Sequence, residues 1–376
     1  MKSTKIFLTL ALLLLSVFFY FLEIPMPGLI GSSAYEEVLE GTVSQAQNES
    51  STDETGATEV NQTLTVEVQK GSISGQSLEV HNSDLQTLDA QLYKEGDEVV
   101  IQKSTDPSTG ESNYSMSDYV RRPVLYWLFG LFLLVVILVS QQQGFESLVG
   151  MIFSFLVIFK WILPLLLAGY DPVLTAISGA LFIIPITFYL SHGISKKTNL
   201  AICGTILTLV LTGILAKIFL TWSHLSGLTD DAALYLKSDT GTTLHFQGLL
   251  LAGIMISMLG ILDDITISQA SVADQLKATK PNIRFPELFS KTMAVGKDHI
   301  ASMVNTLILI YAGASLPLLM LFISNAHPFS EVINYEFVAE EVVQTLVGSI
   351  GLILAVPLTT LLASLGHATK SSSKKN

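Results

Sequence analysis

Long apolar segments, repeated along most of the chain, constrain this fold more than any other feature of the sequence. A helix needs about 20 mostly apolar residues to cross the roughly 30 Å hydrocarbon core of a bilayer. Segments that meet this requirement lie at 6–22, 123–139, 145–168, 173–190, 199–221, 246–262, 300–323 and 341–365. The sequence therefore predicts a mostly α, polytopic helical membrane bundle of about eight transmembrane helices.

The charged residues divide the chain into two compartments. Only 14% of the residues are charged, compared with about 25% in ordinary soluble proteins. Residues 30–120 nevertheless contain 17 acidic residues and 3 lysines, a net charge of −14 that exceeds the −12 of the whole chain. The remainder is apolar and slightly basic. This division predicts a soluble acidic segment and a lipid-embedded body.

Residues 1–23 are predicted to be an N-terminal membrane anchor, with a signal peptide as the alternative. Two lysines precede the apolar run, as in a signal peptide, but that run is longer than usual and no A-x-A cleavage site follows it. The further predicted divisions are an extracytoplasmic segment at 24–118, a seven-helix membrane domain at 119–366 and a basic cytoplasmic tail at 367–376.

The acidic segment is predicted to contain a small β-barrel-like domain at about 36–103. "EEVLEGTV" (36–43), "TLTVEV" (63–68) and "DEVVIQ" (97–102) have the alternation and β-branched content of strands. The polar run at 45–58 has too few apolar residues to pack, so it is predicted to be a disordered linker.

The positions of lysine and arginine predict the orientation in the membrane. Cytoplasmic connections carry an excess of these residues, and the predicted inner loops and tail contain most of them. They are Lys196, Lys197, Lys277, Lys280, Arg284, Lys291, Lys297, Lys370, Lys374 and Lys375. Arg121 and Arg122 lie on the outer side, but long domains translocate largely regardless of charge. We therefore expect a multi-pass protein of the cytoplasmic membrane with both termini inside.

A polar stripe at the end of the segment 246–262 is the first candidate site. "GILDDITISQASVADQL" places two carboxylates directly after an apolar run. On a continuing helix Asp264, Ser268, Ser271 and Gln275 share one face, and Asp263 lies beside it. The alternative is an ordinary amphipathic helix end, because charged residues at a helix exit are inexpensive.

A second polar cluster opens the next predicted span, in "KDHIASMVNTLILIYAGASLP". Asp298, Ser302 and Asn305 share one face, and His299 lies beside Asp298. Since both clusters are predicted at the cytoplasmic end, they can share a cavity in which His299 relays protons or binds a cation. An interfacial histidine that hydrogen-bonds to a carboxylate is the alternative for His299.

Several segments resemble the hallmark segments of the YibE/F family of bacterial multi-pass membrane proteins. These are "GILDDITISQASVADQL", "GKDHIASMVNTLILIYAGASLPLL" and "FVAEEVVQTLVGSIGLILAVPLTTLLA", and the resemblance extends from about Tyr93 to Leu365. It implies a bacterial membrane protein but no reaction, since the family is functionally uncharacterised. Carried over by resemblance, the residues of interest are Asp263, Asp264, Ser268, Gln269, Asp298, His299, Asn305, Glu340 and Glu341.

Taken together, these features favour a transporter of a small polar or ionic substrate, with its site near the cytoplasmic face. The predicted substrate or ion site is Asp263, Asp264, Ser268, Gln269, Asp298, His299 and Asn305. The alternative is a non-transporting scaffold or assembly factor that binds a partner through its β-domain.

An enzyme is the less favoured class. The paired acids of an intramembrane aspartyl protease must lie close together, whereas Asp171 and Asp263 are predicted on opposite sides of the membrane. No catalytic residue, metal site or cofactor is predicted. The expected partners are the lipid bilayer and either another protein or a second copy of the chain. Nucleic acid is excluded because no basic, aromatic-rich patch is present.

Overall fold

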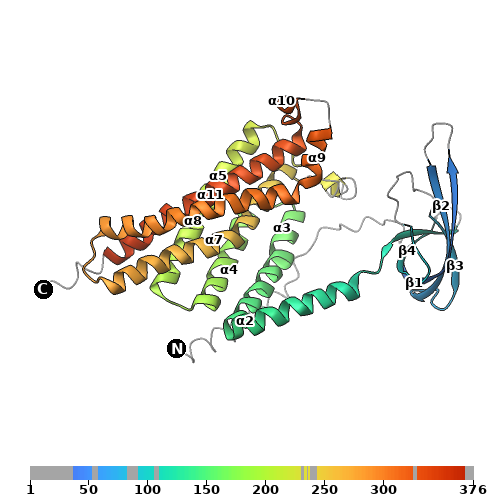
Figure 1. The fold of residues 1–376 in the computed structure, drawn as a ribbon, viewed down its shortest axis with the longest axis horizontal. Coiled ribbons are helices and arrows are strands. Elements are labelled where there is room, and N and C mark those ends of the chain that lie inside the picture. The colour runs from blue at the N-terminus through green and yellow to red at the C-terminus, as the bar shows by residue number, and fades with distance from the viewer. Residues whose placement is uncertain are drawn as a thin grey trace. The chain divides into compact units, whose positions relative to one another are not determined.

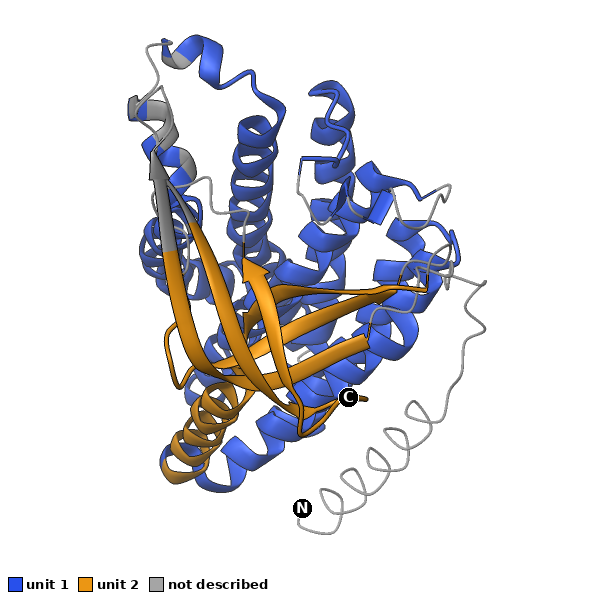
Figure 2. Ribbon diagram, turned by 90° about the vertical axis from the view of Figure 1, so that its right-hand side faces the viewer, with its two compact units in different colours: residues 1–29, 139–376 blue, residues 30–138 orange. Residues whose placement is uncertain are grey.

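The computed structural model covers the whole chain and describes residues 37–52, 58–82, 92–105, 110–229, 233–234, 236–237, 244–324 and 328–368. The chain divides into two compact units (Figure 2), one of residues 30–138 and one of residues 1–29 with 139–376. The predicted boundary at 118/119 falls earlier in the chain than this division. The predicted anchor at 1–23, the residues up to 36 and the tail from 369 onwards lie outside the described residues.

The first unit contains a five-stranded antiparallel sheet (Figure 1). Its strands are β1 (Glu37–Thr52), β2 (Thr58–Lys70), β3 (Ser77–Asn82), β4 (Glu98–Thr105) and β5 (Ser112–Tyr119). They are arranged in the order β3-β2-β1-β4-β5. The two edge strands β3 and β5 contact each other, so the sheet curls into a half-barrel. The three predicted strands overlap β1, β2 and β4.

The prediction of a disordered linker over 45–58 is wrong for residues 45–52. Strand β1 continues through this polar stretch to Thr52 and pairs with β2 up to Thr58. The pairing includes Asn48 opposite Gln62. Backbone hydrogen bonds between antiparallel strands need no apolar side chains, so a hairpin can extend beyond the hydrophobic core that anchors it.

The core of the half-barrel comes from alternate residues of four strands. Leu39, Leu64, Val66, Val99 and Ile101 are fully buried. The buried amide of Gln62 satisfies a neighbouring loop. Its Nε2 donates to the Tyr93 carbonyl at 2.8 Å, and its Oε1 accepts from the Tyr93 N–H at 3.0 Å. The Gln62 side chain therefore takes the place of a neighbouring strand, because it pairs with both the N–H and the carbonyl of Tyr93.

Carboxylates on the half-barrel have cationic or hydrogen-bond-donating partners. Glu37 accepts from the Ser72 hydroxyl and backbone N–H, both at 2.6 Å, and from Lys103 Nζ at 3.2 Å. The hydrogen bonds from Ser72, supported by Lys103, lower the pKa of Glu37. Glu40 pairs with Lys70 and Arg122. Partial burial raises the pKa of Glu40, but these two cations lower it overall.

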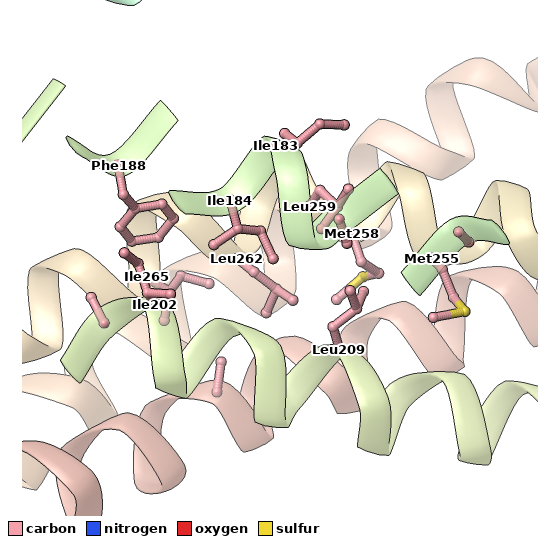
Figure 3. Packing of buried hydrophobic residues seen from close by; sticks show 14 of the residues in the cluster. Ile183, Ile184, Phe188, Ile202, Leu209, Met255, Met258, Leu259, Leu262 and Ile265 are labelled. Carbon is pink, nitrogen blue, oxygen red and sulfur yellow. The ribbon is translucent and has the colours of Figure 1, made fainter. Parts of the chain in front are cut away.

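The second unit is helical. Its elements, together with the helix α2 that begins in the first unit, are α2 (Arg122–Val157), the π-helix η1 (Ile158–Ile162), α3 (Leu163–Leu167), α4 (Pro172–His192), α5 (Lys196–Trp222), α7 (Phe246–Thr279), α8 (Phe285–Ala314), α9 (Leu316–Ser324), α10 (Phe329–Val332) and α11 (Glu336–Ala368). Helices α4, α5, α7 and α11 form the centre of the bundle. Figure 3 shows their packing, with Met258, Leu259 and Leu262 of α7 among Ile184, Phe188 and Leu209.

Five helical runs among the described residues are long and apolar enough to cross a membrane. They are Arg122–Leu167, Pro172–His192, Lys196–Trp222, Phe246–Thr279 and Glu336–His367. These runs support a membrane protein, but they do not support the predicted count of eight spans.

Four of the eight predicted spans account for the difference. The span at 6–22 lies outside the described residues. The spans at 123–139 and 145–168 form one helical run, in which Gln141, at φ 48° and ψ −126°, marks a kink. The span at 300–323 is divided between α8 and α9 at Ser315, and the polar first half of α8 lowers the apolar character of that helix.

Close packing of α5 against α11 depends on glycine. A Cβ atom at Gly351 would lie 2.3 Å from Thr212 Oγ1, and one at Gly204 would lie 2.3 Å from Thr359 Oγ1. Small residues let membrane helices approach closely. Gly351 and Gly204 therefore serve helix packing against Thr212 and Thr359.

Hydrogen bonds define the two ends of the bundle. At one end Lys196 Nζ donates to the Gly366 carbonyl, and His367 Nε2 lies 3.5 Å from Asp274 Oδ1. The start of α5 and the ends of α7 and α11 therefore lie together. At the other end Gln247 Nε2 donates to the Leu220 and Leu225 carbonyls, at 3.2 and 2.9 Å. This brings the end of α5 to the start of α7.

Candidate functional site

Asp263 and Asp264 have different surroundings on α7. Successive residues of a helix point about 100° apart, so adjacent carboxylates need not share a site. Asp264 is exposed, whereas Asp263 is partly buried. The Oδ1 atom of Asp263 is shielded from solvent and has no hydrogen-bond partner among the described residues. A carboxylate in this condition inside an apolar helix points to a functional role.

Asp263 lines a cavity of about 300 Å³ between α2, η1, α4 and α7. Four hydroxyl groups line the same cavity, those of Ser147, Ser154, Thr187 and Ser191. The remaining lining residues are apolar or glycine and include Ile158 of the π-helix. Among the described residues that form it, the cavity therefore combines one carboxylate with several neutral oxygens and has no basic side chain.

Two of the four hydroxyls already use their protons. Ser154 Oγ donates to the Gly150 carbonyl at 3.0 Å, and Thr187 Oγ1 donates to the Ile183 carbonyl at 2.9 Å. A hydroxyl has one proton and two lone pairs. Once the proton is committed to the helix backbone, the oxygen can only accept a hydrogen bond or coordinate a cation.

A second cavity, of about 390 Å³, contains much of the predicted site. Its lining includes Ser268, Gln269, Ser271 and Gln275 of α7 together with His299 of α8. The structure thus brings the polar stripe of α7 to the histidine of the next helix. His192, at the end of α4, also lines this cavity.

The buried amide of Gln269 links three helices. Thr360 Oγ1 of α11 donates to Gln269 Oε1 at 3.0 Å, and Gln269 is fully buried. A Cβ atom at Gly296 of α8 would lie 3.1 Å from Gln269 Oε1. Gln269 therefore holds α7 against α8 and α11 at the edge of the second cavity, in addition to lining it.

A third cavity, of about 530 Å³, lies where α3 meets α4, α5 and α7. Its polar lining includes Asp171, Lys217, Thr221, His245 and Gln247. Asp171 also caps α4, because Oδ1 accepts from the Leu174 N–H at 2.8 Å. Asp171 and Asp263 line different cavities, so they do not form the close acid pair that an aspartyl protease requires.

The three cavities follow one another along the same two helices. The third cavity is lined by residues 247–251 of α7 and 172–173 of α4. The Asp263 cavity comes next, with residues 256–263 of α7 and 183–191 of α4, and is therefore called the middle cavity. The second cavity follows, with residues 267–275 of α7 and residue 192 of α4. At a rise of 1.5 Å per residue, the α7 segment from 247 to 275 spans about 42 Å. That length is comparable to a bilayer with its headgroups.

Other predicted site residues lie away from these cavities. Asp298 and Asn305 are exposed on α8 and line none of the three cavities, and neither does Asp264. The sequence predicted that the two aspartates of α7 share a cavity with His299 and Asn305 of α8. In the structure, His299 shares a cavity with the polar stripe of α7, while Asn305 does not. The reason is that helical periodicity fixes a shared face but not the helix that this face contacts.

The two glutamates carried over by resemblance have separate surroundings. Glu340 Oε2 accepts from Thr229 Oγ1 at 2.5 Å, which ties α11 to the loop after α5. Glu341 lines an apolar cavity of about 340 Å³ between α8, α9 and α11. Neither residue lines the three polar cavities.

The sequence reasoning missed five residues that line the middle cavity, which contains Asp263, or the second cavity. They are Ser147, Ser154, Thr187, Ser191 and His192. A signal for them exists in the sequence. Ser147 and Ser154 are seven residues apart and Thr187 and Ser191 four apart, so each pair shares a helix face within an apolar segment. No group of three or more His, Cys, Asp or Glu side chains suited to a metal occurs among the described residues.

A comparison with known families matches the YibE/F-like protein family over residues 128–369. The chain belongs to the YibE/F family. The matched region starts later than the resemblance noted from the sequence, which began near Tyr93, and it contains all three cavities. No curated protein and no solved structure matches the chain.

Proposed function

We propose that this YibE/F protein is a permease that moves a small polar or ionic solute along the interface of α4 and α7. One observation carries the proposal: three polar cavities succeed one another along these two helices from one end of the bundle to the other. The middle cavity holds Asp263, whose Oδ1 has no partner among the described residues. Intramembrane ionisable residues typically mark substrate or ion pathways.

Buried residues between the cavities supply the barrier that a permease needs. On α4, the stretch between the third and the middle cavity buries Thr175, Ala176, Gly179 and Ala180. A Cβ atom at Gly179 would lie 2.4 Å from Ile162 Cδ1 of η1. The pathway is thus closed at this level, and solute passes when these helices move apart.

Two irregular helical segments flank the middle cavity and offer places to bend. Pro185 lies inside α4 and cannot donate a backbone hydrogen bond to the preceding turn. The π-helix η1 interrupts the regular ladder between α2 and α3, and such segments occur frequently at functional sites. Both features support a pathway that opens by bending of α4 and η1.

The charge distribution supports an orientation for this pathway. Lys196, Lys197, Lys277, Lys280 and Arg284 lie at the end of the bundle that contains the second cavity. By the positive-inside rule this end faces the cytoplasm. We propose that the protein lies in the cytoplasmic membrane, with the third cavity on the outer side, the second cavity on the inner side and both termini inside.

Cysteine accessibility tests the pathway without knowledge of the solute. In a Cys203→Ser background, single cysteines are placed at Leu249, Gly260 and Ser271, which line the third, middle and second cavities. A small, membrane-impermeant thiol reagent is then applied from each side of the membrane. We expect Leu249→Cys to react from outside, Ser271→Cys from inside, and Gly260→Cys from at least one side.

Two control positions calibrate this labelling. Met258→Cys lies in the closed core, and Val210→Cys lies on an exposed apolar face of α5; neither should react. Labelling of Gly260→Cys from neither side would mean that water does not reach the middle cavity and would overturn the proposal. In that case the alternative, a scaffold that binds a partner through the β half-barrel, is favoured, and deletion of residues 30–118 should release that partner.

A further inference from the structure

The middle cavity suggests which ion the pathway uses, and this inference rests on the proposed permease function. We propose that the cavity is a binding site for a monovalent cation of the size of Na⁺. Its ligands are the carboxylate of Asp263 and the hydroxyl oxygens of Ser154 and Thr187, with Ser147 and Ser191 completing the lining.

The charge of Asp263 requires a counter-charge that the lining does not supply. Oδ1 is shielded from solvent and has no hydrogen-bond partner among the described residues. The lining contains no lysine, arginine or histidine. A buried charge without a partner is strongly destabilising, so the carboxylate must take up either a proton or a cation from solution.

The hydroxyl groups favour a cation over an anion or a polar neutral molecule. Ser154 and Thr187 donate their protons to carbonyls of their own helices, Gly150 and Ile183. Their oxygens therefore present lone pairs to the cavity. Hard cations are held by oxygen ligands of this kind, both carboxylate and neutral.

The number of acids sets the charge of the ion. Divalent cations usually recruit several carboxylates, whereas this cavity contains Asp263 alone among the described acids. No group of three or more His, Cys, Asp or Glu side chains that could hold a metal ion occurs among the described residues. A proton would need the carboxylate but no further oxygens, so the surrounding hydroxyls distinguish a Na⁺ site from a protonation site.

Thermal unfolding of the purified full-length protein tests this proposal. The melting temperature is measured in detergent micelles while NaCl replaces choline chloride at constant ionic strength. Binding to the folded state alone raises the melting temperature with ligand concentration. We expect a rise of about 3–6 °C at saturating Na⁺ in the natural sequence.

Variants assign the effect to the cavity. Asp263→Asn should abolish the Na⁺-dependent rise, while Asp264→Asn, which changes the exposed neighbour, should retain it. Thr187→Val and Ser154→Ala preserve the helices and should each weaken the apparent Na⁺ affinity about tenfold. These two also provide the test if Asp263→Asn does not fold.

The outcomes separate this inference from the permease proposal. No Na⁺-dependent rise in the natural sequence, or an equal rise in Asp263→Asn, overturns the ion site, while the cysteine labelling still tests the pathway. Conversely, a rise that depends on Asp263 and Thr187 supports the ion site even if Gly260→Cys is not labelled. A rise that Thr187→Val and Ser154→Ala leave unchanged would also contradict the assigned ligands.

Discussion

The half-barrel and the helical bundle treat their buried or half-buried polar groups in different ways. In the half-barrel, Glu37 and Glu40 are each held by basic or hydrogen-bond-donating partners, and Gln62 pairs with the backbone of Tyr93. In the bundle, several buried threonines donate to carbonyls one turn earlier in their own helices, as Thr208 does to Gly204. Other buried polar atoms of the bundle have no hydrogen-bond partner among the described residues, including Asp263 Oδ1, Gln269 Nε2 and Thr359 Oγ1.

This difference follows from the two solvents. A half-barrel in water can satisfy its edges and charges with long, flexible side chains. A helix in lipid must satisfy its polar groups internally, and a hydroxyl can do so within one turn while a carboxylate cannot. An unpaired carboxylate oxygen is still informative in the bundle, because an ionised carboxylate costs more to bury than the unpaired hydroxyl and amide groups of Thr292, Thr359 and Gln269.

The largest expected effect concerns packing between α5 and α11. Gly351→Val would place side-chain atoms onto Thr212, since even a Cβ atom there lies 2.3 Å from Thr212 Oγ1. We expect a loss of about 3 kcal/mol in stability, measured as thermal unfolding and as the yield of monodisperse protein. Gly253→Val is the matched control, because no atom lies within 4 Å of that position. Adding Thr212→Ala should restore part of the loss; no recovery would contradict the contact.

The next largest effect is expected in the half-barrel. Gln62→Ala removes the partner of both polar groups of the Tyr93 backbone and leaves them buried. Unsatisfied buried groups cost about 1–3 kcal/mol each, so we expect a loss of about 2–3 kcal/mol in the local stability of the sheet. Hydrogen exchange of the β2 and β4 amides measures it. Gln69→Ala, which removes an exposed bond to Thr42, should change exchange little.

A smaller effect is expected from a hydroxyl pair in the bundle. Thr205 Oγ1 and Thr266 Oγ1 lie 2.7 Å apart, so one of the two hydroxyls donates to the other. The other hydroxyl can donate to a carbonyl of its own helix, Ala201 at 3.0 Å for Thr205 or Leu262 at 2.9 Å for Thr266. Side-chain hydrogen bonds between membrane helices average about 0.6 kcal/mol. A double-mutant cycle with Thr205→Val and Thr266→Val should give a coupling energy of about that size. A coupling energy of about 2–3 kcal/mol, as large as the loss expected for Gln62→Ala, would contradict the idea that side-chain hydrogen bonds contribute less in the bundle than in the half-barrel.

The smallest effect is expected from acid on the half-barrel. The folded-state pKa of Glu37 is lowered, chiefly by hydrogen bonds from Ser72 and then by Lys103. A lowered folded-state pKa gives stability that is present above the unfolded value of about 4.5 and is lost as the pH falls through the folded value. Protection of the β1 amides, corrected for intrinsic exchange, should therefore decline between about pH 5 and pH 3. Glu37→Gln should flatten this decline, and an identical slope in that variant would contradict the assignment.

Much of the secondary structure is predictable from the sequence because its signals are local. The apolar segments at 173–190, 199–221, 246–262 and 341–365 correspond to α4, α5, α7 and α11, and the alternating strands correspond to β1, β2 and β4. The predictions failed where distant pairing decides. Residues 45–52 become strand because β2 lies beside them. Separately, the segment 300–323 divides at Ser315, between α8 and α9.

The site was partly predictable for the same reason. Asp263 and the stripe of Ser268, Ser271 and Gln275 are visible as polar residues at helical spacing, and His299 lines the same cavity as that stripe. The hydroxyls of α2 and α4 were not connected to Asp263, because serine and threonine are common in membrane helices and carry no local mark of their contacts.

The sequence by itself determined the apolar helices α4, α5, α7 and α11, parts of strands β1, β2 and β4, and which residues share a helix face, since these depend on composition and on the periods of helix and strand. Only the tertiary structure decided that Asp263 faces the serines and threonine of α2 and α4 while Asp264 does not. Adjacent residues on a helix point in different directions. Which of them faces a neighbouring helix depends on packing against residues that are distant in the chain. Thr187, for example, lies 76 positions from Asp263.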